Sequence, residues 1–291
     1  MDEELRRFAI AAHDRFTHEH GDRRRFMAEV TRLAGGAAAA NLLVAGLAAD
    51  PAAAALIPER DPRVRSDMVS LEVAPGRVLD AYRAAPVRSG THPGVVVLHE
   101  NRGLQPYTRD VARRLAVAGF VALAPDLLTP SGGTPPDEDR ARAMIAALDL
   151  ARTTRDATGA VDWLATRGRS TGKVGVVGFC WGGALADRVA VAADPAAAAI
   201  VSFYGPAPDP AEARHVRAPL LLHYAGLDSR VDASAKPWVE ALSAAGKRFR
   251  SFTYPNVDHA FHNDTAPARY DARAATLAWD RTIAFLKENL A

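Results

Sequence analysis

Short apolar runs alternate with stretches of helical periodicity along most of this chain. The runs lack period-two polarity, which is the pattern of strands that are buried on both faces. They lie at residues 95–99, 120–124, 174–179, 200–204, 220–225 and 249–254. Two further runs, at 68–73 and 78–83, flank Ala74-Pro75-Gly76 and predict a hairpin at one edge of a sheet.

Helical periodicity fills the intervals between these runs. The predicted helices cover residues 108–118, 137–167, 184–193, 234–245 and 268–290. This alternation predicts an α/β fold with a mostly parallel sheet and helices on both faces. Ligands of such folds bind beyond the carboxyl ends of the strands. The loop at 127–138, rich in Pro and Gly, is a candidate cover for a site at that edge.

The chain before Asp61-Pro62 has a different pattern. It is rich in alanine, and apolar side chains recur at helical spacing at Leu5, Phe8, Ala12 and Phe16. We therefore expect an N-terminal helical extension at 1–62, followed by a catalytic domain at 63–291. The extension is also a candidate surface for the formation of a homo-oligomer.

The extension contains a segment with an alternative interpretation. Arg23-Arg24-Arg25-Phe26-Met27 precedes a weakly hydrophobic stretch at 33–56, as in a twin-arginine export signal. The acidic, helix-forming stretch before the arginines is atypical of such signals. We therefore expect a cytoplasmic protein, with export as the alternative. The sequence has no run of eighteen strongly apolar residues, so it predicts no membrane-spanning helix.

Charge and cysteine usage exclude several functions. The 36 basic and 34 acidic residues nearly balance, and no basic stripe with interleaved aromatic residues indicates a nucleic-acid partner. The single cysteine excludes both an intramolecular disulfide and a metal site built from cysteines. We expect neither a metal nor an organic cofactor.

That cysteine lies in the sharpest motif of the chain, Gly178-Phe179-Cys180-Trp181-Gly182-Gly183. The motif follows an apolar strand and precedes a helix, so it has the form of a nucleophile elbow, in which small residues let strand and helix approach. The sulfur would point at a helix N-terminus, where positive partial charge favours the thiolate. The alternative is a small buried hydrophobic residue in a tight glycine turn.

A thiolate nucleophile needs a base, and the base needs an orienting acceptor. Asp228 follows the strand that begins at residue 220, and His259 follows the next strand. The order nucleophile, acid, histidine is the order of the α/β-hydrolases, and it predicts that fold here. Asp258, Asp232 and Asp264 are the rival orienting residues for His259.

Acyl transfer also needs two backbone donors for an oxyanion. The amide of Trp181 is the first candidate, and the amide of Asn101 in the polar loop at 99–103 is the second. Glu100 and Arg102 lie in the same loop, either as functional groups or as a solvated ion pair. We expect a structural role for His99.

These residues resemble the dienelactone hydrolase (carboxymethylenebutenolidase) family from about residue 69 to the C-terminus, and the helical extension resembles that of a subgroup. The similarity includes the cysteine elbow, Asp228, His259 and the segment Ala124-Pro125-Asp126-Leu127. The resemblance implies that Glu100 accepts a proton from Cys180 when substrate arrives.

The chain departs from the family at two positions. Pro130 and Asn263 stand where the diene-lactone enzymes carry two arginines that hold the substrate carboxylate. We therefore expect a neutral or differently charged substrate, with Arg102 as a substitute contact. The sequence predicts hydrolysis of a small ester or lactone through Cys180, His259 and Asp228. The alternatives are a thioesterase, a peptidase and a non-catalytic binding protein with this fold.

Overall fold

The computed structural model describes residues 3–18, 22–47, 55–167 and 170–291. Its centre is an eight-stranded sheet with the order β1-β2-β4-β3-β5-β6-β7-β8. The strands are β1 (Val64–Ala74), β2 (Arg77–Pro86), β3 (His92–Leu98), β4 (Val121–Pro125), β5 (Ser170–Phe179), β6 (Ala197–Phe203), β7 (Leu220–Ala225) and β8 (Phe249–Tyr254). The hairpin β1-β2 is antiparallel, β2 runs antiparallel to β4, and the other neighbours are parallel.

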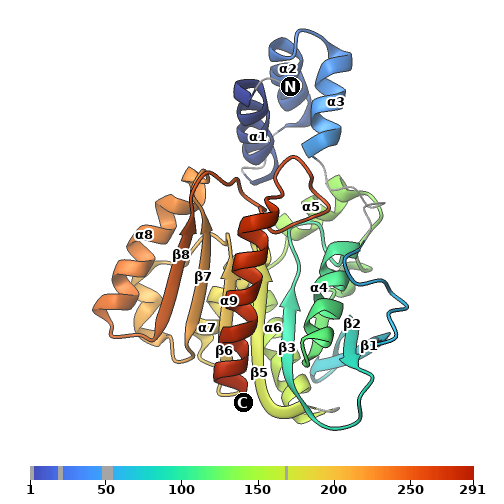
Figure 1. The fold of residues 1–291 in the computed structure, drawn as a ribbon, viewed down its shortest axis with the longest axis vertical. Coiled ribbons are helices and arrows are strands. Elements are labelled where there is room, and N and C mark those ends of the chain that lie inside the picture. Colours follow the sequence, from blue (N-terminus) through green and yellow to red (C-terminus); the bar gives the residue numbers. More distant parts are fainter. Residues whose placement is uncertain (1–2, 19–21, 48–54, 168–169) are drawn as a thin grey trace.

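Helices cover both faces of the sheet (Figure 1). One face carries α4 (Pro106–Val117) and α9 (Ala272–Leu290). The other carries α6 (Leu150–Thr166), α7 (Trp181–Ala192) and α8 (Ser229–Ala244). A further helix, α5 (Glu138–Ala146), and two short 3₁₀ helices, Thr129–Ser131 and Pro210–His215, lie in the connections. This arrangement is the predicted α/β fold.

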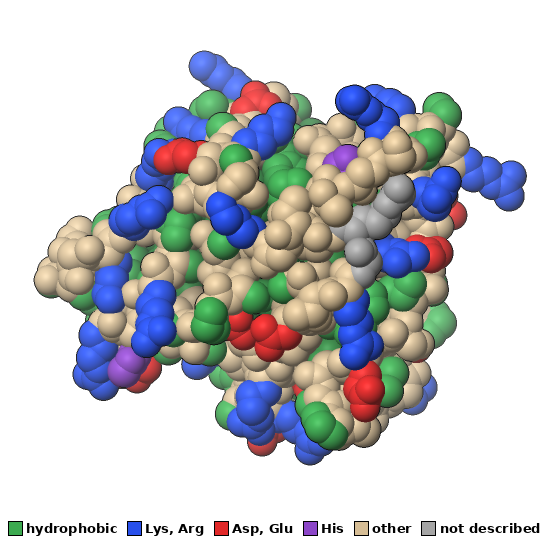
Figure 2. All heavy atoms as spheres, turned by 90° about the horizontal axis from the view of Figure 1, so that it is seen from below, with side chains coloured by type: hydrophobic (Ala, Val, Ile, Leu, Met, Phe, Trp, Pro, Cys, Tyr) green, Lys and Arg blue, Asp and Glu red, His purple; other side chains and the backbone are tan. Residues whose placement is uncertain are grey.

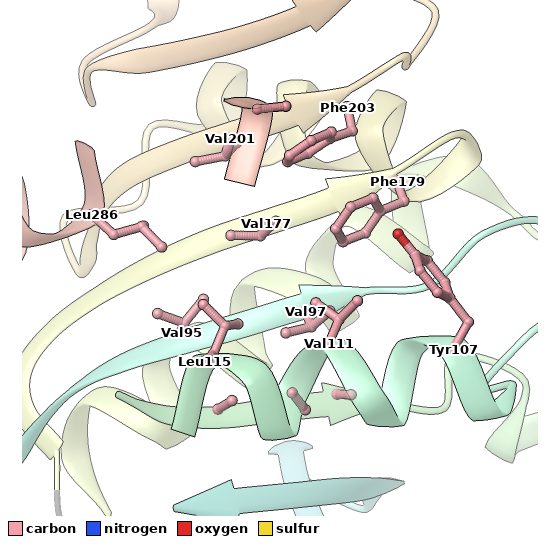
Figure 3. Close-up of a cluster of buried hydrophobic side chains, with 14 of the residues drawn as sticks. Val95, Val97, Tyr107, Val111, Leu115, Val177, Phe179, Val201, Phe203 and Leu286 are labelled. Atoms are coloured by element: carbon pink, nitrogen blue, oxygen red, sulfur yellow. The ribbon is translucent and has the colours of Figure 1, made fainter. Parts of the chain in front are cut away.

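The two apolar cores explain why the strands have no polar face. On the α4 and α9 side, Val95, Val97, Val177 and Val201 project from adjacent strands, and Leu115 packs against them (Figure 3). On the opposite side, Leu98 and Val176 belong to a second core with residues of α6, α7 and α8. Because β3 to β7 are covered on both faces, their apolar runs are continuous rather than alternating.

One predicted helix is wrong in extent. The pattern predicted a continuous helix over 137–167, but the structure has two helices, α5 and α6, separated by residues 147–149. The Asp149 side chain accepts a hydrogen bond from the amide of Arg152 and so caps the start of α6. An N-cap aspartate satisfies a free amide at a helix start. The Asp149 cap therefore starts a new helix at a point where the hydrophobic periodicity of the sequence continues without a break.

Three helices of the extension, α1 (Glu3–His18), α2 (Arg23–Leu33) and α3 (Ala37–Leu47), lie beyond the edge at which the parallel strands end (Figure 1). Their own small core includes Phe16 and Phe26, whose rings stack 4.8 Å apart. The first strand of the sheet, β1, begins at Val64.

The proposed twin-arginine segment lies in a regular helix. Arg23, Arg24 and Arg25 form the first turn of α2, and Asp22 caps it by accepting a hydrogen bond from the Arg24 amide. Part of the stretch at 33–56, residues 48–54, lies outside the described residues. Within the described ranges, no helix has the length and apolarity needed to cross a bilayer.

Charges are dispersed on the face of the molecule that points away from the extension. Figure 2 shows Lys and Arg side chains there as separate groups, with acidic and hydrophobic side chains between them. The described residues of this face form no continuous basic stripe of the kind that binds nucleic acid.

A buried acid in α7 makes the stability of the fold depend on pH. Asp187 is fully buried, and burial raises the pKa of its carboxyl to about 8. Because an unfolded aspartate has a pKa near 4, the native state loses stability as the pH rises from about 4 to about 8. Asp187→Asn is expected to stabilise the protein by roughly 2 kcal/mol more at pH 7 than at pH 5.

Urea unfolding of both proteins at the two pH values measures this difference. The exposed Glu240→Gln is the matched control, because it removes the same charge from the surface of helix α8. An equal effect of Asp187→Asn on the free energy of unfolding at pH 5 and pH 7 would contradict the raised pKa of Asp187.

Candidate active site

Cys180 stands at the corner between β5 and α7. Its backbone has φ 55° and ψ −117°, and it is the N-cap residue of α7. A Cβ on Gly178 would lie 1.9 Å from the Gly182 carbonyl oxygen, and a Cβ on Gly182 would lie 2.3 Å from the Leu98 carbonyl oxygen. Both positions must therefore be glycine, which is the steric condition of a nucleophile elbow.

Strained backbone gathers around this corner. Positive φ values occur at Cys180 (55°), at Tyr204 after β6 (40°) and at Ala260 beside His259 (65°). Such conformations cost an L-residue about 1–3 kcal/mol each and persist where the surrounding structure imposes them. Hydrogen bonds impose two of them, because the Cys180 amide donates to the Phe203 carbonyl and the Tyr204 amide donates to the His223 carbonyl.

His259 and Asp228 meet Cys180 at the same edge of the sheet. Asp228 follows β7, and His259 follows β8. The His259 Nδ1 atom lies 2.5 Å from Asp228 Oδ2, and Cys180 interacts with the same imidazole. The other carboxylate oxygen of Asp228 accepts from the Val231 amide and caps α8. The rival Asp264 pairs instead with Arg114 at 2.6 Å.

The charges of this group are mutually stabilised. Burial opposes a charge on His259, but the negative charges of Cys180 and Asp228 outweigh it and raise the pKa of His259 to about 10. Burial would likewise raise the pKa of Asp228, but the adjacent His259 lowers it below its usual value. This arrangement can hold an imidazolium between a thiolate and a carboxylate.

The Trp181 amide is available for an oxyanion. Trp181 is the first residue of α7, so its N–H belongs to the first turn and has no carbonyl partner within the helix. The Trp181 ring stacks on buried His99, with ring centres 5.6 Å apart. His99 Nδ1 lies 2.7 Å from the Glu100 carbonyl oxygen, and His99 Nε2 accepts from the Leu127 amide. The contacts of His99 are thus those of a structural residue.

Glu100 and Asn101 both reach the pocket of Cys180. Glu100 lines a small cavity of about 30 Å³ together with Cys180 and His259, and its Oε2 accepts a hydrogen bond from Asn263 Nδ2 at 2.8 Å. Burial raises the pKa of Glu100. The Asn101 side chain donates to the Thr17 carbonyl in α1 at 3.3 Å. Asn263 therefore binds Glu100.

Arg102 lies at the rim of the same cavity, where its Nε is 3.3 Å from Glu138 Oε2. No described residue of the loop at 127–138 lines the chamber beside Cys180, but Leu128 packs in one apolar cluster with Ile145 of α5 and Trp181. The Asp126 carboxylate accepts hydrogen bonds from the Leu128 and Thr134 amides and folds the loop back on itself. The cover over Cys180 comes instead from α1 and α5.

A larger chamber of about 510 Å³ opens on the other side of Cys180 and Trp181. Its wall is mostly apolar and includes Phe16 from α1 and Ile145 from α5. Two guanidinium groups, Arg142 and Arg230, also line it, and none of the described lining residues is acidic. The Nε and Nη2 atoms of Arg230 are buried and have no hydrogen-bond partner within the described part of the chain. The chamber has the mixed apolar and positive character of a small-ligand site.

Sequence patterns had not identified Phe16, Arg142 or Arg230 as site residues. Helical spacing marked Phe16 as one of a row of apolar positions, but spacing does not say which surface the row covers. Arg142 and Arg230 lie near helix starts without a motif. Among the described side chains, no group of three or more His, Cys, Asp or Glu residues is placed to hold a metal ion.

Comparison with known proteins agrees with this fold. The sequence pattern of the Dienelactone hydrolase family matches residues 79–290. A Methylorubrum extorquens protein named "Putative carboxymethylenebutenolidase" is 33% identical over 219 residues, which cover 70% of this chain and 75% of that protein.

Two crystal structures of similar proteins share the fold. A dienelactone hydrolase from Anabaena variabilis has a TM-score of 0.64 at 26% identity and covers 79% of this chain and 100% of its own. A dienelactone hydrolase-like promiscuous phosphotriesterase from metagenomic libraries has a TM-score of 0.70 at 25% identity, with the same coverage. The chain therefore belongs to the dienelactone hydrolase family and has the α/β-hydrolase fold.

Proposed function

We propose that this protein hydrolyses a small ester or lactone, with Cys180 as the nucleophile. The observation that carries the proposal is the position of the His259 imidazole between Cys180 and Asp228, at a strained strand-to-helix corner. An imidazolium in that position stabilises the thiolate once the sulfur has lost its proton, and the carboxylate holds the ring in the orientation that faces the sulfur.

The reaction proceeds in two steps. The Cys180 sulfur attacks the ester carbonyl, and the amides of Trp181 and Asn101 stabilise the oxyanion. As the C–O bond breaks, His259 gives its proton to the leaving alkoxide, which leaves a thioester on Cys180. His259 then takes a proton from a water molecule that attacks the thioester, and the sulfur leaves as thiolate while the carboxylic acid is released.

Glu100 would act before the first step. The family resemblance assigns it the proton of the resting thiol, and two observations support this role: Glu100 shares the small cavity with Cys180, and burial raises the pKa of its carboxyl, which favours the proton-bound form. The hydrogen bond from Asn263 fixes the side chain at that place.

The substrate class follows from the chamber beside Cys180. Its apolar wall suits a hydrocarbon substituent, and the guanidinium groups of Arg142 and Arg230 favour neutral or anionic esters over cationic ones. Arg102 is a weaker candidate for a substrate contact, because it already pairs with Glu138. Since the thioester must itself be hydrolysed, lactones and activated esters are better substrates than amides, which disfavours a peptidase.

Alkylation of the sulfur tests the proposal. Iodoacetamide is expected to label Cys180 and to abolish turnover of p-nitrophenyl acetate in parallel, because the chain has no second thiol. A competing ester should slow both processes. Complete labelling with unchanged turnover would exclude Cys180 as the nucleophile, and would leave a non-catalytic role for this pocket.

A further inference from the structure

We propose that α1 of the N-terminal extension forms a wall of the substrate chamber, and that Phe16 limits the length of the apolar substituent that the enzyme accepts. This inference rests on the proposed function, because it takes the chamber beside Cys180 as the substrate site. It gives the extension, which precedes the residues that match the family, a role in specificity.

Helix α1 lies directly over the reacting groups. Phe16 and Thr17 line the chamber of about 510 Å³ together with Cys180 and Trp181. His13 and Thr17 line the small cavity that contains Cys180 and His259. The helix therefore meets the site on both sides of the sulfur.

Polar contacts fix α1 to the catalytic unit. Buried Arg269 donates from Nη1 to Asp14 Oδ1 at 2.6 Å, and its Nη2 lies 2.8 Å from His13 Nδ1. Burial lowers the pKa of His13, so its ring is neutral and accepts this bond. Together with the bond from Asn101 to the Thr17 carbonyl, these contacts hold α1 at two points. A helix held in this way can form a wall of defined position.

Phe16 is a partition between two cavities. The Phe16 ring and the Arg142 guanidinium stack at 3.9 Å, and both residues line the Cys180 chamber as well as a second cavity of about 340 Å³ between the extension and the start of α5. Phe26, the stacking partner of Phe16, lines only the second of these two cavities. Removal of the Phe16 ring would therefore join the two spaces.

Chain-length preference tests the partition. In Phe16→Ala, the ratio of kcat/KM for p-nitrophenyl octanoate to that for p-nitrophenyl acetate is expected to rise about tenfold, the usual scale of selection in an apolar pocket. The larger ring of Phe16→Trp is expected to lower the ratio. A parallel series of alkyl acetates examines the alcohol side of the ester in the same way.

Phe26→Ala is the matched control. It removes the same stack from the core of the extension without opening the chamber, so its ratio should equal that of the wild type. An equal rise in Phe26→Ala would mean that loosening of the extension, and not the wall, sets the preference. If circular dichroism shows that Phe16→Ala has lost helix, the inference is judged on Phe16→Trp alone. A lower ratio of octanoate to acetate turnover in that variant supports the role of Phe16, and an unchanged or higher ratio contradicts it.

The outcomes separate this inference from the proposed function. If the esterase activity survives loss of the Cys180 sulfur, the proposed function fails and with it the assignment of the chamber. If the activity depends on Cys180 and neither ester series responds to Phe16→Ala or Phe16→Trp, only the role of α1 is overturned.

Discussion

Replacement of Cys180 by alanine is expected to lower kcat/KM for p-nitrophenyl acetate by about 10⁵-fold, the scale seen when a hydrolase loses its nucleophile. Without the sulfur, no thioester forms, and only binding and the oxyanion donors remain. The buried volume barely changes, because Cys180 is 4% exposed and alanine removes a single heavy atom. Initial rates under substrate-limited conditions measure the loss.

Two further measurements make this result specific. The variant should unfold at a similar temperature to the wild type, which shows that the site and not the fold is lost. Cys180→Ser keeps a nucleophilic atom at the same corner and should retain more activity than Cys180→Ala, though far less than the wild type, since an alcohol is a poorer nucleophile at this position. A Cys180→Ala protein with more than about a tenth of the wild-type rate would exclude Cys180 as the nucleophile.

The fold could be predicted because its signals are local. Continuous apolar runs mark strands that are covered on both faces, as in β3 to β7, and the predicted run at 249–254 coincides with the edge strand β8. The edge hairpin followed from Ala74-Pro75-Gly76. Helix starts were less accurate: α7 begins at Trp181 rather than at 184, and α8 at Ser229 rather than at 234. The elbow determines the first turn of α7, and the Asp228 cap determines that of α8. Hydrophobic periodicity does not report either of these local features.

The candidate site was predictable only in part, for a physical reason. Cys180, Asp228 and His259 follow three parallel strands, so strand order alone brings them to one edge of the sheet. The wall of the chamber comes from α1, which lies more than a hundred residues before Cys180 in the sequence. Its position depends on contacts such as that between Arg269 and Asp14. No local spacing encodes such a long-range contact, so the pattern gave the helix but not the surface that it covers.

The second large effect is expected for Asp228→Asn, which should lower kcat/KM by roughly 10³-fold. The asparagine can keep the cap on α8 but loses the charge that stabilises the imidazolium of His259. Because Asp228 is one of the two groups whose negative charge raises the pKa of His259 to about 10, that pKa must fall in the variant. The pH profile of kcat/KM reports this change.

The sign of the shift distinguishes an electrostatic role from a purely structural one. In the wild type, His259 keeps its proton up to about pH 10, so protonation of the leaving group fails only above that value. In Asp228→Asn the alkaline limb should move to lower pH, in addition to the loss of rate. Asp232→Asn, one turn further along α8, removes a similar charge and leaves the bond between Asp228 and His259 in place. It should shift the limb little, and an equal shift in both variants would mean that Asp228 acts only through the general field of the pocket and does not orient the ring.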